Sequence, residues 1–284
     1  YLNRFYLLVF LAGFGLILSF PPFPTGLLST ISLIPVLIIS EQYSGKKAFW
    51  GGYAAGLLWS SGTLYWIGWA TIPGLIGTLL INSLYFALFT WLQNILFKRF
   101  PKHGFMAAPF LWVAIELLAS TGDTGFPWNL LGHTLTSIPE LIQYASVTGV
   151  FGVSFVIVWI NVLIFKALQV SLKVKKAMYY SIACLLLLIP FIQGHVLLSR
   201  PAPHEKPFRI ALIQGNLDPY RRWTPDFVDS SFQVYEHAAM ALNTDSIDLM
   251  IWPESASPCY IKHRYSCQKR LKQLVRESQV PLLT

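Results

Sequence analysis

A single carboxylate follows a short apolar run late in the chain. Residues 247–252 read Ile-Asp-Leu-Met-Ile-Trp, and Pro253 and Glu254 come directly after them. The run predicts a buried strand, and Pro253 ends it because proline cannot donate to a sheet ladder. An acid in this place is suited to general acid–base catalysis. It is also compatible with a solvated acid after a strand, because one carboxylate alone is weak evidence of a site.

The segments around Glu254 predict where this acid lies. From Val228 to Leu242, apolar residues follow a 4-3-4-3 spacing, which is typical of an amphipathic helix. The predicted order is strand, helix, strand, helix, strand, over residues 209–214, 228–242, 247–252, 265–278 and from 280 onward. This alternation favours a parallel α/β sheet, and sites in such sheets lie beyond the carboxyl ends of the strands. We expect Glu254 at that edge.

The composition divides the chain into two parts. Of its 284 residues, 54% are hydrophobic and 12% are charged, whereas soluble proteins carry about 25% charged residues. Acids are few before Arg200, and residues 201–284 are ordinarily polar. We therefore expect a transmembrane helical domain at 1–200, a Pro-rich linker at 201–207 and a water-soluble domain at 208–284. The formal net charge of +8 does not indicate nucleic-acid binding, because the basic residues of the first part lie in short loops.

Seven apolar segments are candidates for membrane-spanning helices, which need roughly 20 apolar residues each. They are residues 2–20, 26–40, 48–70, 75–97, 105–120, 141–168 and 177–198. Lys and Arg occur before the first segment and after the second, fourth and sixth, and the other loops between segments contain neither. Positive residues stay on the cytoplasmic side of a membrane. We therefore expect a cytoplasmic N-terminus and an extracytoplasmic domain that carries Glu254.

The three cysteines predict neither a metal site nor a disulfide framework. Cys184 lies within the last apolar segment, where we expect a packing role. Cys259 and Cys267 are able to pair if their domain faces an oxidising compartment, and the sequence leaves this pairing open. We expect no metal and no cofactor.

Several motifs occurring together resemble a known family. Residues 208–216 (Phe-Arg-Ile-Ala-Leu-Ile-Gln-Gly-Asn) and 249–255 (Leu-Met-Ile-Trp-Pro-Glu-Ser) resemble the opening of the carbon–nitrogen hydrolase (nitrilase) fold. Residues 125–132 (Gly-Phe-Pro-Trp-Asn-Leu-Leu-Gly) resemble the GFPW arm of apolipoprotein N-acyltransferases. Residues 111–117 resemble the segment just before that arm, and residues 149–155 resemble the start of the family's sixth span. The resemblance covers the whole chain and implies seven spans followed by the first part of a nitrilase-like α/β domain.

The resemblance also implies an activity, the completion of lipoprotein acylation in the bacterial cytoplasmic (inner) membrane. In this family a Cys takes an acyl chain from a membrane phospholipid as a thioester. The α-amino group of a diacylglyceryl-cysteine apolipoprotein then attacks that thioester. A Glu acts as general base and a Lys stabilises the oxyanion, and by motif position Glu254 is the base. Trp223 matches a family Trp near the substrate pocket, although an aromatic anchor at the membrane interface is also compatible with it.

The chain departs from the family pattern after Glu254. The family's Lys and Cys lie further downstream, and no residue of this chain matches them. Cys259 lacks the sequence context of the nucleophile, and Lys262, Lys269 and Lys272 fall in a predicted helix rather than at a strand end. The chain starts without Met and ends within an apolar run, so we expect a fragment of a longer protein that is inactive by itself.

Two features of the first part have open interpretations. Glu116 lies inside an apolar segment, where an acid is costly and indicates function by default, although an interfacial or helix-pairing role is equally compatible. The aromatic residues are expected to face lipid or the interface, and those near 59–69 could instead line a slot for an acyl chain.

Two other classes of function also remain open. One is a membrane-tethered amidase or nitrilase, in which water is the acceptor. The other is a non-catalytic multi-pass binding or transport protein, although no predicted span carries paired charges or matched breaks in two halves.

Overall fold

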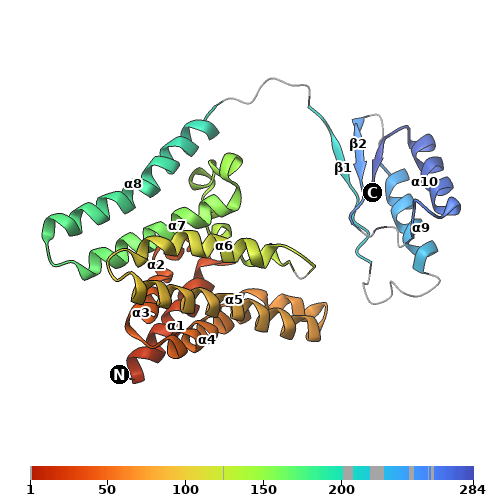
Figure 1. Ribbon diagram of the computed structural model, residues 1–284. Helices are drawn as coiled ribbons and strands as arrows, with labels where there is room; N and C mark the ends of the chain where they lie inside the picture. Colours follow the sequence, from red (N-terminus) through yellow and green to blue (C-terminus); the bar gives the residue numbers. More distant parts are fainter. Residues whose placement is uncertain are drawn as a thin grey trace. The chain divides into compact units, whose positions relative to one another are not determined.

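The computed structural model describes residues 2–123, 125–200, 207–217, 227–242, 246–254, 256 and 259–284. The chain forms two compact units, Tyr1–Pro201 (unit 1) and Ala202–Thr284 (unit 2). Unit 1 is mostly helical, and unit 2 contains a small sheet covered by helices (Figure 1). We describe each unit by itself.

Unit 1 consists of helices joined by short loops and 3-10 turns. In chain order they are α1 (Leu2–Ser19), η1 (Gly26–Leu28), α2 (Ser29–Ser32), α3 (Ile34–Gln42), α4 (Gly45–Leu64), η2 (Tyr65–Trp69), α5 (Ile72–Arg99), η3 (Gly104–Ala107), α6 (Ala108–Ser120), η4 (Pro127–Asn129), η5 (Leu131–Leu135), η6 (Pro139–Leu141), α7 (Ala145–Gln169) and α8 (Lys173–Leu198).

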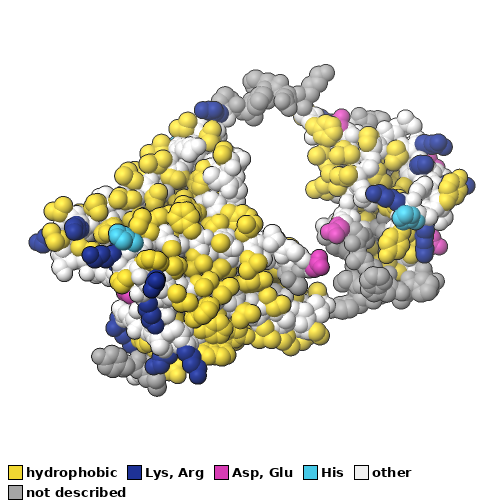
Figure 2. Space-filling view, in the orientation of Figure 1, with side chains coloured by type: hydrophobic (Ala, Val, Ile, Leu, Met, Phe, Trp, Pro, Cys, Tyr) yellow, Lys and Arg dark blue, Asp and Glu magenta, His cyan; other side chains and the backbone are white. Residues whose placement is uncertain are grey.

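Helices occupy all seven apolar ranges predicted from the sequence. Three of them, α5, α7 and α8, are long and apolar enough to cross a membrane, and the apolar helices near residues 3–19, 26–42 and 104–120 are shorter. Hydrophobic side chains cover most of the visible face of unit 1 (Figure 2). Lys and Arg gather mainly at the end that holds the N-terminus and the turn between α7 and α8. Seven spans and their orientation remain predictions.

The segment 26–42 is broken rather than one continuous helix. The break falls at Leu33, which lies between α2 and α3. There Asn161 of α7 bridges both sides of the break: its Oδ1 accepts a hydrogen bond from Leu33 N–H at 2.9 Å, and its Nδ2 donates to Ser29 O at 2.8 Å. These bonds matter because an unpaired backbone group in an apolar interior is costly. The segment is thus an interior element held by α7.

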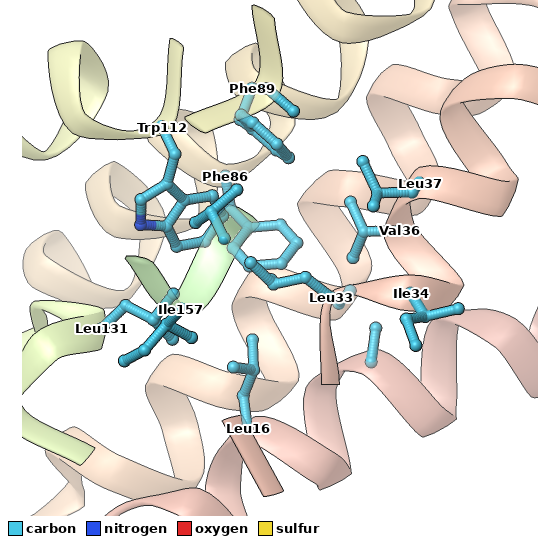
Figure 3. Close-up of a cluster of buried hydrophobic side chains, with 14 of the residues drawn as sticks. Leu16, Leu33, Ile34, Val36, Leu37, Phe86, Phe89, Trp112, Leu131 and Ile157 are labelled. Carbon is cyan, nitrogen blue, oxygen red and sulfur yellow. The ribbon is translucent and has the colours of Figure 1, made fainter. Parts of the chain in front are cut away.

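The core of unit 1 joins side chains from most of its helices. Figure 3 shows Leu16 of α1, Leu37 of α3, Phe89 of α5 and Trp112 of α6 close together. The rings of Phe89 and Trp112 meet edge to face with their centroids 4.8 Å apart. The expectation that the aromatic residues face lipid or the interface is therefore wrong for these rings.

Cys184 differs from its predicted packing role. It is a free thiol on the exposed surface of α8. The cause is that α8 buries only Ala183 and Gly194 among its described residues, so most of this helix faces away from its neighbours.

Helices α4 and α5 approach closely through two glycines that are four residues apart. A Cβ added to Gly56 would lie 2.7 Å from Phe86 Cβ and 3.1 Å from Ser83 Cα. Gly52 faces Thr90 of α5 in the same way, one turn earlier. Small residues at this spacing let two helix backbones come close. The van der Waals packing that results stabilises helix pairs in lipid, where the hydrophobic effect does not act between helices.

Unit 2 contains a three-stranded parallel sheet in the order β1-β2-β3, with β2 in the centre. Its elements are β1 (Ile210–Leu212), α9 (Phe227–Met240), β2 (Leu249–Ile251), α10 (Tyr265–Ser278) and β3 (Leu282–Leu283). The predicted parallel α/β order is confirmed, and the strands are shorter than the predicted ranges. Phe232, Tyr235, Met250, Trp252 and Leu274 form much of the buried core, as the 4-3 spacing of the first helix requires.

The close approach of α4 and α5 yields a test of the packing of unit 1. The substitution Gly56→Ala forces Phe86 and Ser83 to move. Overpacking of this kind lowers the free energy of unfolding by about 1–3 kcal/mol. We expect a lower midpoint of thermal unfolding in detergent. Gly77→Ala is the matched control, because a Cβ at Gly77 meets no atom within 4 Å. Equal midpoints for the two variants would contradict this packing.

Candidate active site

Glu254 lies just beyond the carboxyl end of the central strand of unit 2. The sheet ladder continues through Trp252, whose N–H donates to Leu283 O at 2.9 Å, and it stops at Pro253. Glu254 follows as an exposed residue in a turn. Among the residues that the structure describes, its carboxylate has no hydrogen bond or ion pair, so it is free to receive a proton from a bound group.

The turn that carries Glu254 is fixed on both sides. Ala256 N–H donates to Pro253 O at 3.0 Å, which closes a turn with Glu254 as its second residue. Ala256 is buried, and its carbonyl accepts a hydrogen bond from the Ser231 hydroxyl of α9. On the strand side, the Trp252 ring packs against Tyr235 with their centroids 5.0 Å apart. The described residues on either side of Glu254 are therefore anchored, Trp252 in the sheet and Ala256 against α9.

Polar residues also follow β1 at the same edge of the sheet. Ile213 N–H donates to Ile251 O, and Gln214 comes directly after it. Gln214 Nε2 donates to Asn216 Oδ1 at 2.7 Å. Gly215 passes so close to α9 that a Cβ there would lie 2.7 Å from the Tyr235 ring. Because the strands are parallel, this polar pair and Glu254 share one edge.

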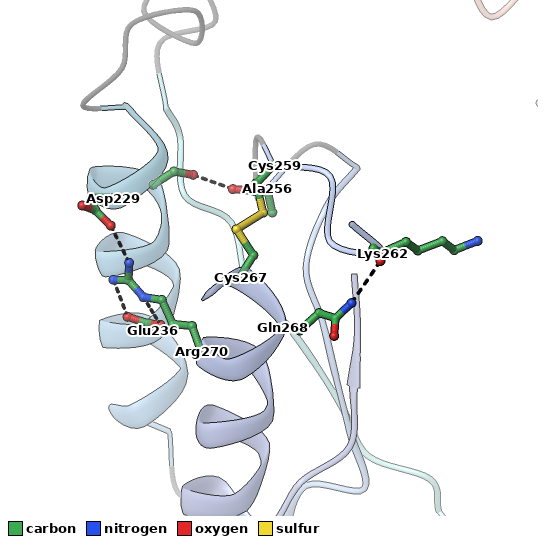
Figure 4. Close-up of a disulfide and its surroundings, with 9 residues drawn as sticks. Asp229, Glu236, Ala256, Cys259, Lys262, Cys267, Gln268 and Arg270 are labelled. Carbon is green, nitrogen blue, oxygen red and sulfur yellow. Dashed lines mark hydrogen bonds and ion pairs between the residues drawn. A yellow bond between two sulfur atoms is a disulfide. The ribbon is translucent and has the colours of Figure 1, made fainter. Parts of the chain in front are cut away.

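A disulfide joins Cys259 to Cys267 and so ties the segment after Glu254 to the start of α10 (Figure 4). The sequence left this pairing open, since it depends on the redox compartment. A second tie joins α10 to α9 (Figure 4): Arg270 binds both carboxylate oxygens of Glu236, at 2.6 and 2.8 Å, and reaches Asp229 at 2.8 Å. The hydrogen bond that Arg270 donates to Glu236 raises the pKa of Arg270 above its ordinary value, so this tie stays charged.

The other residues discussed in the sequence analysis of this domain are Trp223 and three lysines. Trp223 lies outside the described residues. Lys269 and Lys272 lie on α10, as predicted, but the prediction is wrong for Lys262, which precedes the helix. The carbonyl of Lys262 accepts a hydrogen bond from Gln268 Nε2, which keeps that residue in the loop (Figure 4). The described residues contain no group of three His, Cys, Asp or Glu side chains suited to a metal ion.

Glu116 binds the arm of unit 1, which is the segment of residues 125–132 named in the sequence analysis. Its Oε1 accepts hydrogen bonds from Leu131 N–H at 2.7 Å and from Trp112 Nε1 at 2.8 Å. A neighbouring bond, from Gly132 N–H to Ser154 Oγ at 2.8 Å, ties the same arm to α7. Glu116 is 7% exposed, so its side chain is buried within unit 1 rather than at its surface. Its carboxylate instead pairs backbone that would otherwise be unsatisfied.

Comparison with known proteins places these features in context. Residues 12–163 match the family model described as the apolipoprotein N-acyltransferase N-terminal domain. Proteins named apolipoprotein N-acyltransferase are similar to nearly the whole chain. The one from Geobacter metallireducens is 34% identical over 97% of this chain and 56% of its own length. The one from Chlorobaculum tepidum is 29% identical over 100% of this chain and 55% of its own length.

The chain thus spans about half the length of the curated relatives that it matches. The relatives are bacterial, and the apolar helices of unit 1 agree with a membrane protein. The matched family model covers more than half of the chain, including the helices α2 to α6 and the arm held by Glu116. The chain belongs to the apolipoprotein N-acyltransferase family.

Proposed function

We propose that the protein containing this chain transfers an acyl chain from a membrane phospholipid to the α-amino group of a diacylglyceryl-cysteine apolipoprotein. The observation that carries the proposal is the position of Glu254, an exposed carboxylate just past the carboxyl end of the central parallel strand. Membership of the family supports the same activity. Because the chain spans about half of its relatives, the activity is proposed for the whole protein.

In this proposal Glu254 is the general base of both half-reactions. It first takes the proton of a Cys thiol, and the thiolate attacks the ester carbonyl of the phospholipid. The lysophospholipid leaves with the proton, and the acyl group stays on sulfur as a thioester. Glu254 then takes a proton from the attacking α-amino group, and the amide forms as the thiolate leaves. A thiol needs such a base because only a small fraction is ionised at neutral pH.

Other groups complete the proposed site. A Lys would stabilise the negative oxygen of each tetrahedral intermediate, which is the role that fixed positive donors serve in acyl transfer. Neither this Lys nor the Cys has a counterpart in this chain. Trp223 would lie near the substrate pocket. No metal or cofactor takes part in these steps.

We further propose that unit 1 crosses the bacterial cytoplasmic membrane seven times and that unit 2 lies outside the cytoplasm. The alternation of Lys and Arg between the apolar segments supports this orientation. The disulfide in unit 2 supports it independently, because disulfides persist in oxidising compartments and are rare in the cytoplasm.

The role of Glu254 is tested in the full-length protein by Glu254→Gln. Gln keeps the size of the side chain but cannot take a proton, and loss of a general base costs about 10²–10⁴-fold in rate. We expect both lysophospholipid release and acylation of the apolipoprotein, measured in proteoliposomes, to fall by about this factor.

The matched control is Glu277→Gln, an exposed acid on α10 that only accepts a hydrogen bond from Gln273. It should leave the rate unchanged. Unchanged acylation in Glu254→Gln would remove Glu254 as the base. Lysophospholipid release that continues beyond one turnover without an apolipoprotein acceptor would instead favour a hydrolase with water as acceptor.

The proposed orientation is tested by the state of the cysteines. Of the three cysteines of this chain, we expect N-ethylmaleimide, added during denaturation without reductant, to modify only Cys184. Cys259 and Cys267 should react only after reduction, and the count is read by peptide mass spectrometry. Modification of all three without reductant would place unit 2 in a reducing compartment and contradict the orientation.

A further inference from the structure

A hollow opens in unit 1 where the start of α1, the end of α3 and the start of α4 meet. It is an open space of about 1380 Å³, and Lys46 and Lys47 of α4 line it. Four aromatic side chains and the polar residues Gln42 and Ser44 complete its wall. We call this space the basic hollow. It lies at the end of unit 1 that holds the N-terminus, where Lys and Arg gather (Figure 2).

Lys46 and Lys47 have no acidic partner among the residues that the structure describes. No Asp or Glu lines the basic hollow, and the preceding acid in the chain, Glu41, accepts a hydrogen bond from Gln169 of α7 at 2.5 Å. Both lysines are exposed and lie in the first turn of α4, which contains no acid. The N-terminal end of a helix carries partial positive charge, so two cations there are repelled. An anion bound in the basic hollow would offset this repulsion.

The basic residues of the neighbouring helix are arranged in the opposite way. Lys98 and Arg99 lie in the last turn of α5, where the helix end carries partial negative charge and stabilises cations. This end of α5 lies beside the start of α4, because a Cβ added to Gly45 would lie 3.3 Å from Asn94 Oδ1. Either arrangement satisfies the rule that positive residues stay on the cytoplasmic side. That rule therefore does not account for two lysines around one hollow.

Contacts outside the basic hollow hold its wall in place. Asn94 Nδ2 of α5 donates to Tyr43 O at 2.9 Å and so holds the turn between α3 and α4. The Tyr43 ring packs against Phe5 of α1 with the centroids 5.0 Å apart. Gly51 of α4 approaches the same Phe5 ring so closely that a Cβ there would lie 2.9 Å from it. The wall is thus formed without a ligand, which lowers the cost of binding one.

An apolar stripe on α1 begins at the basic hollow. Tyr6, which lines the hollow, is followed at intervals of four residues by Phe10 and Phe14, and the three are 59%, 49% and 41% exposed. Residues at this spacing share one face of a helix, and the rings of Phe10 and Phe14 stack with their centroids 5.2 Å apart. Trp50 of α4 also lines the hollow and is 56% exposed. These surfaces together fit a molecule with a negatively charged head and a long apolar body.

We propose that the basic hollow binds the phosphate head of an anionic phospholipid. The phosphate accepts hydrogen bonds from the ammonium groups of Lys46 and Lys47, and an acyl chain lies along the stripe from Tyr6 to Phe14. In the orientation proposed above, this lipid belongs to the cytoplasmic leaflet, whose anionic lipids bind basic pockets between membrane helices. The site contains no residue of the proposed acyl transfer. Only the choice of leaflet rests on the proposed orientation.

The test compares two lipids that have the same chains and differ in the charge of the head. The full-length protein in detergent is equilibrated with dialkyl ether phosphatidylglycerol or with dialkyl ether phosphatidylcholine, neither of which has an ester to cleave. Lipid retained by the protein is counted by native mass spectrometry. We expect roughly tenfold stronger retention of the anionic lipid, since each lysine near a charged head contributes to binding. Added salt should reduce this preference, because exposed charges are screened.

The double variant Lys46→Gln, Lys47→Gln should retain the two lipids equally. The matched control is Lys98→Gln, Lys102→Gln, which removes the same charge from the same end of unit 1 but does not alter the wall of the basic hollow. It should keep the preference for the anionic lipid. Thermal midpoints in detergent without lipid show that both variants fold. We expect the first variant to be no less stable than the unmodified protein, because its lysines oppose the helix dipole.

Three results would overturn the proposal. The first is equal retention of the two lipids by the unmodified protein. The second is a preference that survives in the Lys46→Gln, Lys47→Gln variant, or that the control loses to the same extent. The third is displacement of phosphatidylglycerol by inorganic phosphate, which would make the basic hollow a site for a soluble anion. None of these results depends on acyl transfer, so a failure here leaves the role of Glu254 untouched, and the reverse also holds.

Discussion

The fold of unit 1 depends on polar side chains that pair broken backbone inside an apolar structure. Among lipids, a backbone N–H or C=O has no water to bind, so any interruption of a helix must be satisfied by the protein. Asn161 does this for the break at Leu33. Asn94 of α5 does it for the end of α3, where its Nδ2 donates to Ser40 O at 2.7 Å and to Tyr43 O at 2.9 Å.

The arm after α6 follows the same rule and gives unit 1 its internal space. Glu116 accepts from the backbone of Leu131, and Ser154 accepts from that of Gly132. These bonds hold non-helical backbone against α6 and α7, and the arm then lines a small space beside α4, α5 and α6. A continuous bundle of helices would pack more fully and leave less room. The polar residues thus permit both the irregular backbone and the space beside it.

Elements marked by a local sequence pattern were predicted, whereas contacts between residues far apart in the chain were not. The 4-3 spacing after Val228 predicted α9, and the apolar run ending at Pro253 predicted the central strand and the place of Glu254 at the sheet edge. The role of Asn161 was not predicted, because its partner Leu33 is 128 residues away and no local pattern marks the pair. The bond from Ser231 to Ala256 was missed for the same reason.

The sequence indicated that Glu116 is unusual but did not indicate which groups it binds. The sequence places this acid within an apolar segment, where a carboxylate is costly unless it is paired. In the structure the side chain is buried. Its partners are a backbone N–H and an indole, which composition cannot reveal. The break at Leu33 does carry a local signal, because Pro35 lies in the first turn of α3, and the prediction of one segment over residues 26–40 missed it.

The bond between Cys259 and Cys267 makes the segment after Glu254 depend on the redox state of its compartment. The two cysteines are only eight positions apart, so the bond can form as soon as this stretch of chain reaches an oxidising compartment. In a reducing compartment both thiols would stay free, and the segment after Glu254 would lose its tie to α10. Exposure to oxidising surroundings and completion of the loop beside the acid are thereby joined in a single covalent event.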